Sequence, residues 1–119
     1  MLEEAIQKAD LLVVVDHGKG FVWRMRSFLC RTTIPILLDP SHNGGWTDYG
    51  RVELIKATAG ELAARVPDPC THDPVGSQID SVREVASQWV ITDGPQGLYY
   101  SPAPNERHCR HVPTHPVDP

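Results

Sequence analysis

The sequence predicts a doubly wound α/β domain with a mainly parallel sheet and an antiparallel addition near the C-terminus. Short apolar runs rich in β-branched residues alternate with segments of helical periodicity, which is the pattern of strand–helix–strand units. Acidic and hydroxyl side chains follow several of these runs directly. A chain of 119 residues has room for one domain, so we expect a single domain over residues 1–119. The apolar runs are Leu11–Val15, Ile34–Leu38, Val52–Ile55 and Trp89–Thr92.

The first half of the chain opens with a short predicted helix, whose acidic first turn complements the helix dipole. Leu11–Val15 is a continuous apolar run, which is typical of a parallel strand covered on both faces. Phe21–Cys30 has helical spacing, and Ile34–Leu38 forms the second strand. Residues 41–50 are rich in Gly, Asn and Asp, so we expect a loop there.

The third predicted strand, Val52–Ile55, leads into a helix that extends through Arg65. This helix is opened by a capping box, Thr58-Ala59-Gly60-Glu61. Prolines and a glycine in residues 67–76 indicate a linker. An apolar stripe then predicts a helix over about Ser77–Gln88.

The last predicted parallel strand is Trp89–Thr92. Gly94–Gly97 is a turn, and Leu98–Tyr100 returns from it as an antiparallel strand. Residues 108–112 have the character of one further strand. Residues 101–119 are rich in proline, so we expect this tail to be largely irregular.

Composition excludes several function classes. The net charge is −4 and no Lys/Arg run is longer than two, which argues against a nucleic-acid partner. The longest apolar stretch is far shorter than the ~20 residues that span a bilayer, and the N-terminus lacks signal-peptide features, so we expect no membrane association. An odd number of widely spaced cysteines predicts reduced thiols and a cytoplasmic location.

Polar residues at the predicted strand ends are the candidates for a ligand site, because ligands of such sheets bind beyond the carboxyl ends of the strands. The segment Asp16–Gly20 places an acid and a lysine around two glycines, which suits a polar substrate but also a tight turn with a solvated Lys19. Asp39 is either a second such acid or a turn cap. These strand-end residues are Asp16, His17, Asp39, Lys56, Thr58, Thr92 and Asp93.

The capping box has two interpretations. As a helix cap it accounts for Thr58 and Glu61 without any ligand. Alternatively, Glu61 organises a divalent cation and a phosphate at the helix N-terminus. A separate cluster around His108, Cys109, His111 and His115 resembles metal ligands, but its spacing matches no common zinc site. A small metal-binding regulator is therefore the least favoured of the functions considered.

Taken in order, the segments resemble the ribokinase-like (PfkB) carbohydrate kinases, nearest their heptose 7-phosphate kinase branch. Residues 12–21 are similar to that branch's "VVVSDYGKG", and residues 35–40 to its "PVLVDPK". Tyr49 falls where the branch has a tyrosine before the next strand. Residues 90–99 are similar to "VVTLGEEGALY", the strand and turn on the nucleotide side.

The resemblance implies a partial ribokinase-like, Rossmann-like fold and ATP-dependent, Mg²⁺-requiring phosphorylation of a sugar or sugar phosphate. It implies substrate binding by Asp16, Lys19 and Asp39. Nucleotide contacts would come from Thr58, Thr92 and Gly94. The metal would be held by Glu61, which matches the Glu of the family's "PNxxE" motif.

This sequence departs from the family at several points. Ala57-Thr58 replaces the Pro-Asn of the metal motif, and Asp93 places a negative charge near the expected phosphates. The chain ends at Pro119, in a segment similar to the run-up to "VDTTGAGD", so no catalytic base is expected within it. We therefore expect a fragment or truncated relative of a sugar kinase, inactive alone. The alternative is a non-catalytic nucleotide- or sugar-phosphate-binding module, and in either case exposed sheet edges favour a homo-oligomer.

Overall fold

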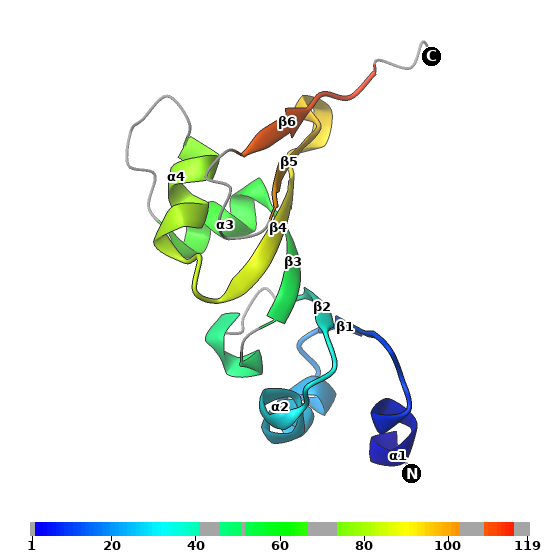
Figure 1. Ribbon diagram of the computed structural model, residues 1–119. Helices are drawn as coiled ribbons and strands as arrows, with labels where there is room; N and C mark the ends of the chain where they lie inside the picture. The colour runs from blue at the N-terminus through cyan, green and yellow to red at the C-terminus, as the bar shows by residue number, and fades with distance from the viewer. Residues whose placement is uncertain (1, 41–45, 51, 67–73, 103–108, 116–119) are drawn as a thin grey trace.

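The computed structural model describes residues 2–40, 46–50, 52–66, 74–102 and 109–115. Its centre is one six-stranded sheet in which the strands lie in the order β1-β2-β3-β4-β5-β6 (Figure 1). The first four strands pair in parallel, and β5 and β6 are added antiparallel. The predicted α/β fold, with its mainly parallel sheet and antiparallel C-terminal addition, is confirmed. The strands are β1 (Leu12–Val15), β2 (Ile36–Asp39), β3 (Val52–Thr58), β4 (Ala86–Thr92), β5 (Leu98–Ser101) and β6 (Arg110–Val112).

The helices cover one side of the sheet. α3 contacts β3 and β4, α4 contacts α3 and β5, and α2 packs against the 3₁₀ helix η1 (Figure 1). Buried residues of the central strands alternate toward this side, including Ile55 and Ala57 of β3 and Trp89 and Ile91 of β4. The helical elements are α1 (Leu2–Gln7), α2 (Phe21–Arg31), η1 (Trp46–Tyr49), α3 (Ala59–Arg65), α4 (Pro74–Ser81) and η2 (Gly94–Gln96).

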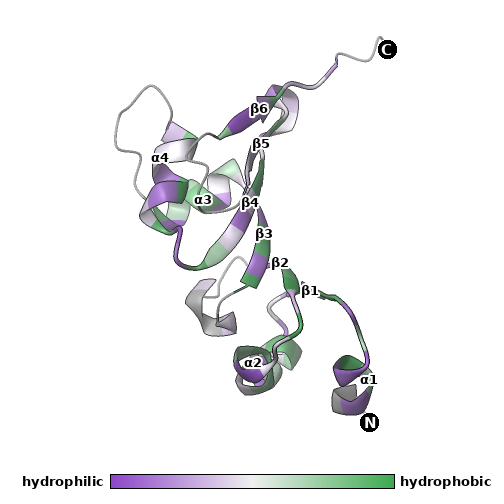
Figure 2. Cartoon of the chain, viewed as in Figure 1, coloured by the Kyte–Doolittle hydropathy of each residue, from purple (hydrophilic) through white to green (hydrophobic). Residues whose placement is uncertain are grey.

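Strand β1 is not covered on both faces, so that expectation is wrong. Val14 faces the core and is 9% exposed, whereas Val13 is 64% exposed. Leu11 and Val15 lie on the exposed side as well. β1 stands at the edge of the sheet and is green along its length in Figure 2, so its exposed face is apolar. A continuous apolar run cannot distinguish one covered face from two, because it lacks the alternation that marks the solvent side.

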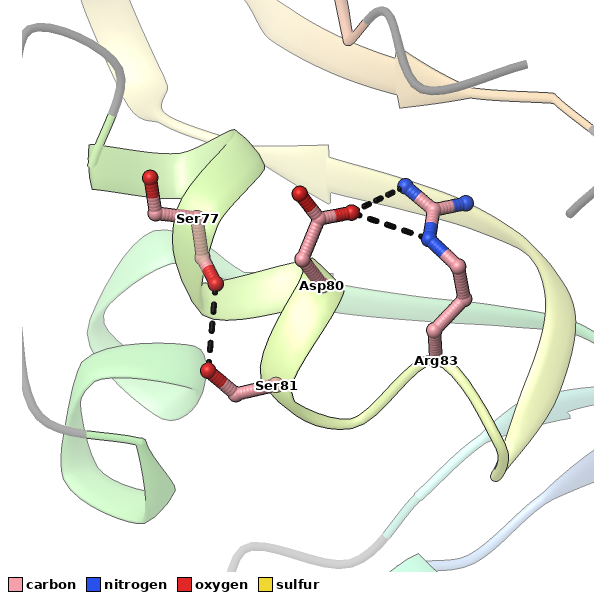
Figure 3. A network of polar contacts seen from close by, with 4 residues as sticks. All are labelled: Ser77, Asp80, Ser81 and Arg83. Carbon is pink, nitrogen blue, oxygen red and sulfur yellow. Dashed lines mark hydrogen bonds and ion pairs between the residues drawn. The ribbon is translucent and has the colours of Figure 1, made fainter. Parts of the chain in front are cut away.

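The helix expected over Ser77–Gln88 is shorter and begins earlier. α4 starts at Pro74, a residue suited to the first helical turn, and ends at Ser81. Arg83 then donates to Asp80 Oδ1 from Nε (2.9 Å) and Nη2 (2.6 Å) across the helix end (Figure 3). Figure 3 also shows the Ser81 hydroxyl donating to the Ser77 carbonyl oxygen. Beyond this end, Ala86 pairs with Val52, and that ladder contact places 86–88 in β4.

Several local predictions are confirmed or fall outside the described residues. The helix after the capping box ends at Arg65 as expected, and the strand Leu98–Ser101 returns antiparallel. β6 is the further strand expected near residues 108–112. In the expected loop 41–50, Trp46–Tyr49 forms η1, whereas 41–45 lie outside the described residues. Of the expected linker over residues 67–76, only 74–76 are among the described residues, and they belong to α4.

β6 holds the turn between β4 and β5. His111 stacks on Tyr99 with ring centroids 4.7 Å apart, and its Nε2 lies 2.5 Å from the Gln96 carbonyl oxygen. The Thr114 hydroxyl donates to the Pro95 carbonyl oxygen at 2.6 Å. Gly97 has φ +96°, and a Cβ there would lie 2.0 Å from the Val112 carbonyl oxygen. Only glycine fits this approach, because both the backbone angle and the space exclude a side chain.

We therefore expect Gly97→Ala to lower the free energy of unfolding by about 3 kcal/mol, combining a strained backbone with a steric overlap. Gly94→Ala is the matched control. Gly94 also has a positive φ, +50°, but nothing lies within 4 Å of its Cβ position, so the expected loss is about 1 kcal/mol. Urea unfolding measures both values, and equal losses would contradict the close contact between the turn and β6.

Candidate functional site

Parallel pairing brings the polar strand ends together along the side of the sheet where the carboxyl ends of β1–β4 meet, which is the strand-end edge. Val15 pairs with Asp39, and the Asp16 N–H donates to the Asp39 carbonyl oxygen at 2.9 Å. Thr58 at the end of β3 pairs directly with Thr92 at the end of β4. The strand-end residues singled out from the sequence thus follow consecutive parallel strands, at the edge where sheets of this class bind ligands.

Asp16 is anchored by two donors. Its Oδ1 accepts the Gly18 N–H at 2.8 Å, and its Oδ2 accepts the hydroxyl of Tyr49. Gly18 and Gly20 have φ values of 75° and 93°, which form the tight turn before α2. Lys19, at the tip of this turn, is exposed. The segment Asp16–Gly20 is therefore a tight turn, and this turn presents the Asp16 carboxylate and the Lys19 amine at the strand-end edge.

Asp39 and Lys56 form a second polar group. Lys56 Nζ lies 3.6 Å from Asp39 Oδ2, with side chains 44% and 38% exposed. Lys56 alternates with the buried residues Ile55 and Ala57, so the pair lies on the face opposite to the helix-covered core. Tyr49, the partner of Asp16, belongs to that core. The Asp16 and Asp39 carboxylates therefore leave adjacent strand ends toward opposite faces.

Thr58 and Glu61 form the capping box that the sequence predicts. The Thr58 hydroxyl oxygen accepts the Glu61 N–H at 3.0 Å, and Glu61 Oε1 accepts the Thr58 N–H at 3.4 Å. Mg²⁺ commonly takes one or two carboxylates from a protein and the rest of its ligands from water and phosphates. The Glu61 carboxylate fits that donor set. Among the described residues, no group of three or more His, Cys, Asp or Glu could hold a metal alone.

The turn after β4 is closed by backbone hydrogen bonds. The Asp93 N–H donates to the Gly97 carbonyl oxygen at 2.8 Å, and the Gly97 N–H donates to the Gly94 carbonyl oxygen at 3.1 Å. The Asp93 side chain makes no cap hydrogen bond. The Thr92 hydroxyl donates a long hydrogen bond of 3.5 Å to the Ala57 carbonyl oxygen.

The cluster considered for zinc is arranged differently. His111 is engaged with Tyr99 and the Gln96 carbonyl, in contacts that serve the fold. His108 lies outside the described residues. Within the part of the chain that the structure describes, no helix is long and apolar enough to cross a membrane.

Two residues of the edge received no role from the sequence. Tyr49 was noted only for its match to the kinase branch, and its contact with Asp16 joins residues 33 positions apart. Lys56 was recognised as a strand-end residue, but its ion pair depends on the register of β2 and β3. Strand alternation could have placed Lys56 on the exposed face, whereas no local pattern signals the Tyr49 contact.

Two surface hollows lie elsewhere. One of about 450 Å³ lies at the amino end of β2, beside the ends of α1 and α2. It is lined by Gln7, Phe28, Arg31, Thr32, Thr33 and Ile34. The other, of about 240 Å³, runs beside β1 and is mainly apolar, with Phe21 and Met25 among its lining residues. Neither contains the polar strand ends, and the chemistry of Asp16, Asp39 and Thr58 favours the strand-end edge over the larger hollow.

Comparisons with known proteins support the fold. No family model matches the chain, and no curated protein matches it. Solved structures do match. A mutant phosphofructokinase-2 from Escherichia coli is 23% identical with a TM-score of 0.75, over 98% of this chain and 41% of that chain. The same enzyme in complex with fructose-6-phosphate is 22% identical with a TM-score of 0.71, over 98% and 42%. Ribokinase of Arabidopsis thaliana, complexed with ribose and ATP, is 13% identical with a TM-score of 0.71, over 97% and 38%.

The chain thus spans about two fifths of the length of the solved structures it matches. At these identities the likeness establishes the fold, a ribokinase-like α/β sheet. The narrower resemblance to heptose 7-phosphate kinases stays a prediction.

Proposed function

We propose that the chain forms part of an ATP-dependent kinase that transfers a phosphoryl group to a hydroxyl of a sugar or sugar phosphate. The observation that carries this proposal is the row of polar strand ends on a ribokinase-like sheet. Similar structures bind fructose-6-phosphate in one case, and ribose with ATP in another. The proposal extends to a cytoplasmic location, where ATP and sugar phosphates are available, and to the heptose 7-phosphate branch as the nearest relative.

The sugar side of this site consists of Asp16, Lys19 and Asp39. Carboxylates accept hydrogen bonds from hydroxyl groups, and both acidic residues are partly exposed. Lys19, exposed on its glycine-rich turn, supplies a positive charge for the phosphate of a sugar phosphate. Because the two carboxylates leave the sheet on opposite faces, the sugar would straddle the strand ends.

The nucleotide side consists of Thr58, Thr92 and Gly94, with Glu61 directed to Mg²⁺. Thr58 and Thr92 are paired in the β3–β4 register, and Gly94 opens the turn without a side chain. A bound magnesium ion supplies charge that neutralises the phosphates. Catalysis of phosphoryl transfer depends mainly on such positioning and charge stabilisation. Asp93 would oppose nucleotide binding electrostatically, because its carboxylate places a negative charge beside the phosphates.

The matched structures are more than twice as long as this chain, so we propose that the 119 residues supply only one part of the catalytic site. The remaining groups, including the catalytic base, would then come from outside them. The second candidate is a non-catalytic nucleotide- or sugar-phosphate-binding module. It is favoured by the capping box, which already engages Thr58 and Glu61 within the fold.

Exposed sheet edges support a further proposal, that two copies associate. Val13 and Val15 of β1, with Leu11 just before it, form an apolar face that is about half exposed. At the opposite edge, β6 ends the sheet with Arg110 and His111. Apolar edge strands pair readily with another chain, and charged edges resist pairing. We therefore propose that a second copy covers β1.

Sedimentation velocity tests this association. We expect wild-type protein to form a dimer and Val13→Lys to be monomeric, because a charge on β1 opposes edge pairing. Val112→Lys is the matched control, since Val112 is a comparably exposed valine on the other edge strand. A monomeric wild-type protein, or equal effects of the two substitutions, would contradict the proposal.

Calorimetric titration with fructose 6-phosphate and with Mg²⁺–ATP tests the function. We expect Asp16→Asn and Asp39→Asn each to weaken fructose 6-phosphate binding about tenfold or more, because each removes a charged hydrogen-bond acceptor. Asp80→Asn is the control, since Asp80 lies on α4 and pairs with Arg83 just beyond the end of that helix. Unchanged binding in the Asp16 and Asp39 variants would place the sugar elsewhere.

The same titrations separate the two candidate functions. A part of a kinase binds sugar phosphate and ATP together, whereas a binding module takes one of them. We expect no phosphorylation above background from the 119 residues alone, because one part of a site cannot stabilise the transition state. Turnover that Asp16→Asn abolishes would show instead that these residues contain the whole catalytic machinery.

A further inference from the structure

Tyr49 lies in the core, yet its hydroxyl reaches the strand-end edge. The side chain is 3% exposed and belongs to the same buried cluster as Val14 and Leu38 of the first two strands. The hydroxyl donates to Oδ2 of Asp16. A buried phenol needs a hydrogen-bond acceptor, and here that acceptor is a carboxylate that also faces solvent. The contact therefore joins the core to the candidate site.

The backbone around Tyr49 is fixed by packing against α2. Tyr49 is the last residue of η1, and η1 packs on α2. The next residue, Gly50, has φ +73°, and a Cβ there would lie 3.1 Å from Cys30 Cα and 3.3 Å from Cys30 Sγ. Only glycine allows the chain to approach α2 this closely. The position of the Tyr49 ring is thus set by the fold and not by the site.

The Asp16 carboxylate is held from both sides. The Gly18 N–H occupies Oδ1 and the Tyr49 hydroxyl occupies Oδ2, so rotation of the carboxylate would break one bond or both. An ionised carboxylate offers about four lone-pair sites. Two internal donors leave acceptor capacity on each oxygen for outside hydroxyl groups. A carboxylate ordered in advance loses less side-chain entropy when it binds a ligand.

We propose that Tyr49 is a positioning residue, whose buried hydroxyl fixes the Asp16 carboxylate in the orientation that accepts the hydroxyl hydrogens of a sugar. The inference rests on the proposed function, because it takes sugar hydroxyls as the donors that Asp16 binds. Tyr49 acts through Asp16 and does not contact the ligand. A purely structural role would change the stability of the core and leave the Asp16 turn unaltered.

NMR spectroscopy tests the positioning role without any ligand. In Tyr49→Phe the Asp16 carboxylate is released, so we expect the amide proton of Gly18 to move upfield as its bond to Oδ1 weakens. The amide proton of Asp16 donates to Asp39 within the sheet ladder and is expected not to move. Tyr100→Phe is the matched control, because the Tyr100 hydroxyl donates to Gln88 Oε1 and not to the site. An unchanged Gly18 resonance in Tyr49→Phe would overturn the proposal.

A second variant serves if Tyr49→Phe does not fold. Tyr49→3-fluorotyrosine keeps the ring and the hydroxyl, and its fluorine resonance reports the hydrogen bond. We expect that resonance to shift on Asp16→Asn and to stay in place on Asp80→Asn. A fluorine resonance that ignores Asp16→Asn would contradict the contact on which the proposal stands.

Binding of fructose 6-phosphate then tests the consequence for the site. We expect Tyr49→Phe to weaken binding about tenfold, the loss typical of one hydrogen bond to a charged group. Combined with Asp16→Asn, it should cause no further loss, because Tyr49 acts through Asp16. Additive losses would overturn the proposal. If the wild-type protein binds neither fructose 6-phosphate nor Mg²⁺–ATP, the proposed function fails, whereas the Gly18 and fluorine resonances still decide whether Tyr49 positions Asp16.

Discussion

Parallel pairing of β1 with β2 decides where the polar groups of the candidate site lie. The ladder continues past the last residue of β1, because the Asp16 N–H donates to the Asp39 carbonyl oxygen. Two acids from separate parts of the chain therefore stand on neighbouring strand ends. Val15 pairs with Asp39, and successive side chains of a strand point to opposite faces, so Asp16 points away from the face of Asp39 and toward Tyr49. The neighbouring register of β2 and β3 brings Asp39 to Lys56. A shift of one residue in β1 would turn Asp16 away from Tyr49.

The two faces of this edge have different environments. On the helix-covered side, the Asp16 carboxylate accepts a hydrogen bond from Tyr49, which lies in the buried core together with Trp46. On the other side, the Asp39–Lys56 pair is more than a third exposed, so its mutual attraction is weak and each partner can exchange for a ligand. A rigid acceptor and an exchangeable ion pair at one edge suit a substrate that carries both hydroxyl groups and a phosphate.

Local patterns in the sequence predicted some of this arrangement. The Thr58–Glu61 capping box depends on spacing within one helical turn, and it is present with both of its hydrogen bonds. The strand-end positions of Asp16 and Asp39 followed from apolar runs that end in an acid. The exposure of Val13 did not follow, because an edge strand with only apolar residues has no alternation to reveal it. The Asp16–Tyr49 contact depends on tertiary packing across 33 residues, which no local pattern encodes.

The central claim is that the strand-end edge binds both sugar phosphate and nucleotide. Mapping backbone amide shifts by NMR during titration with fructose 6-phosphate and with Mg²⁺–ATP tests it most directly. The account predicts that the shifts concentrate in residues 16–20, 39, 56–61 and 92–97. Residues 31–34, which line the larger hollow at the amino end of β2, should not respond. Shifts centred on residues 31–34, or no shifts with either ligand, would contradict the account.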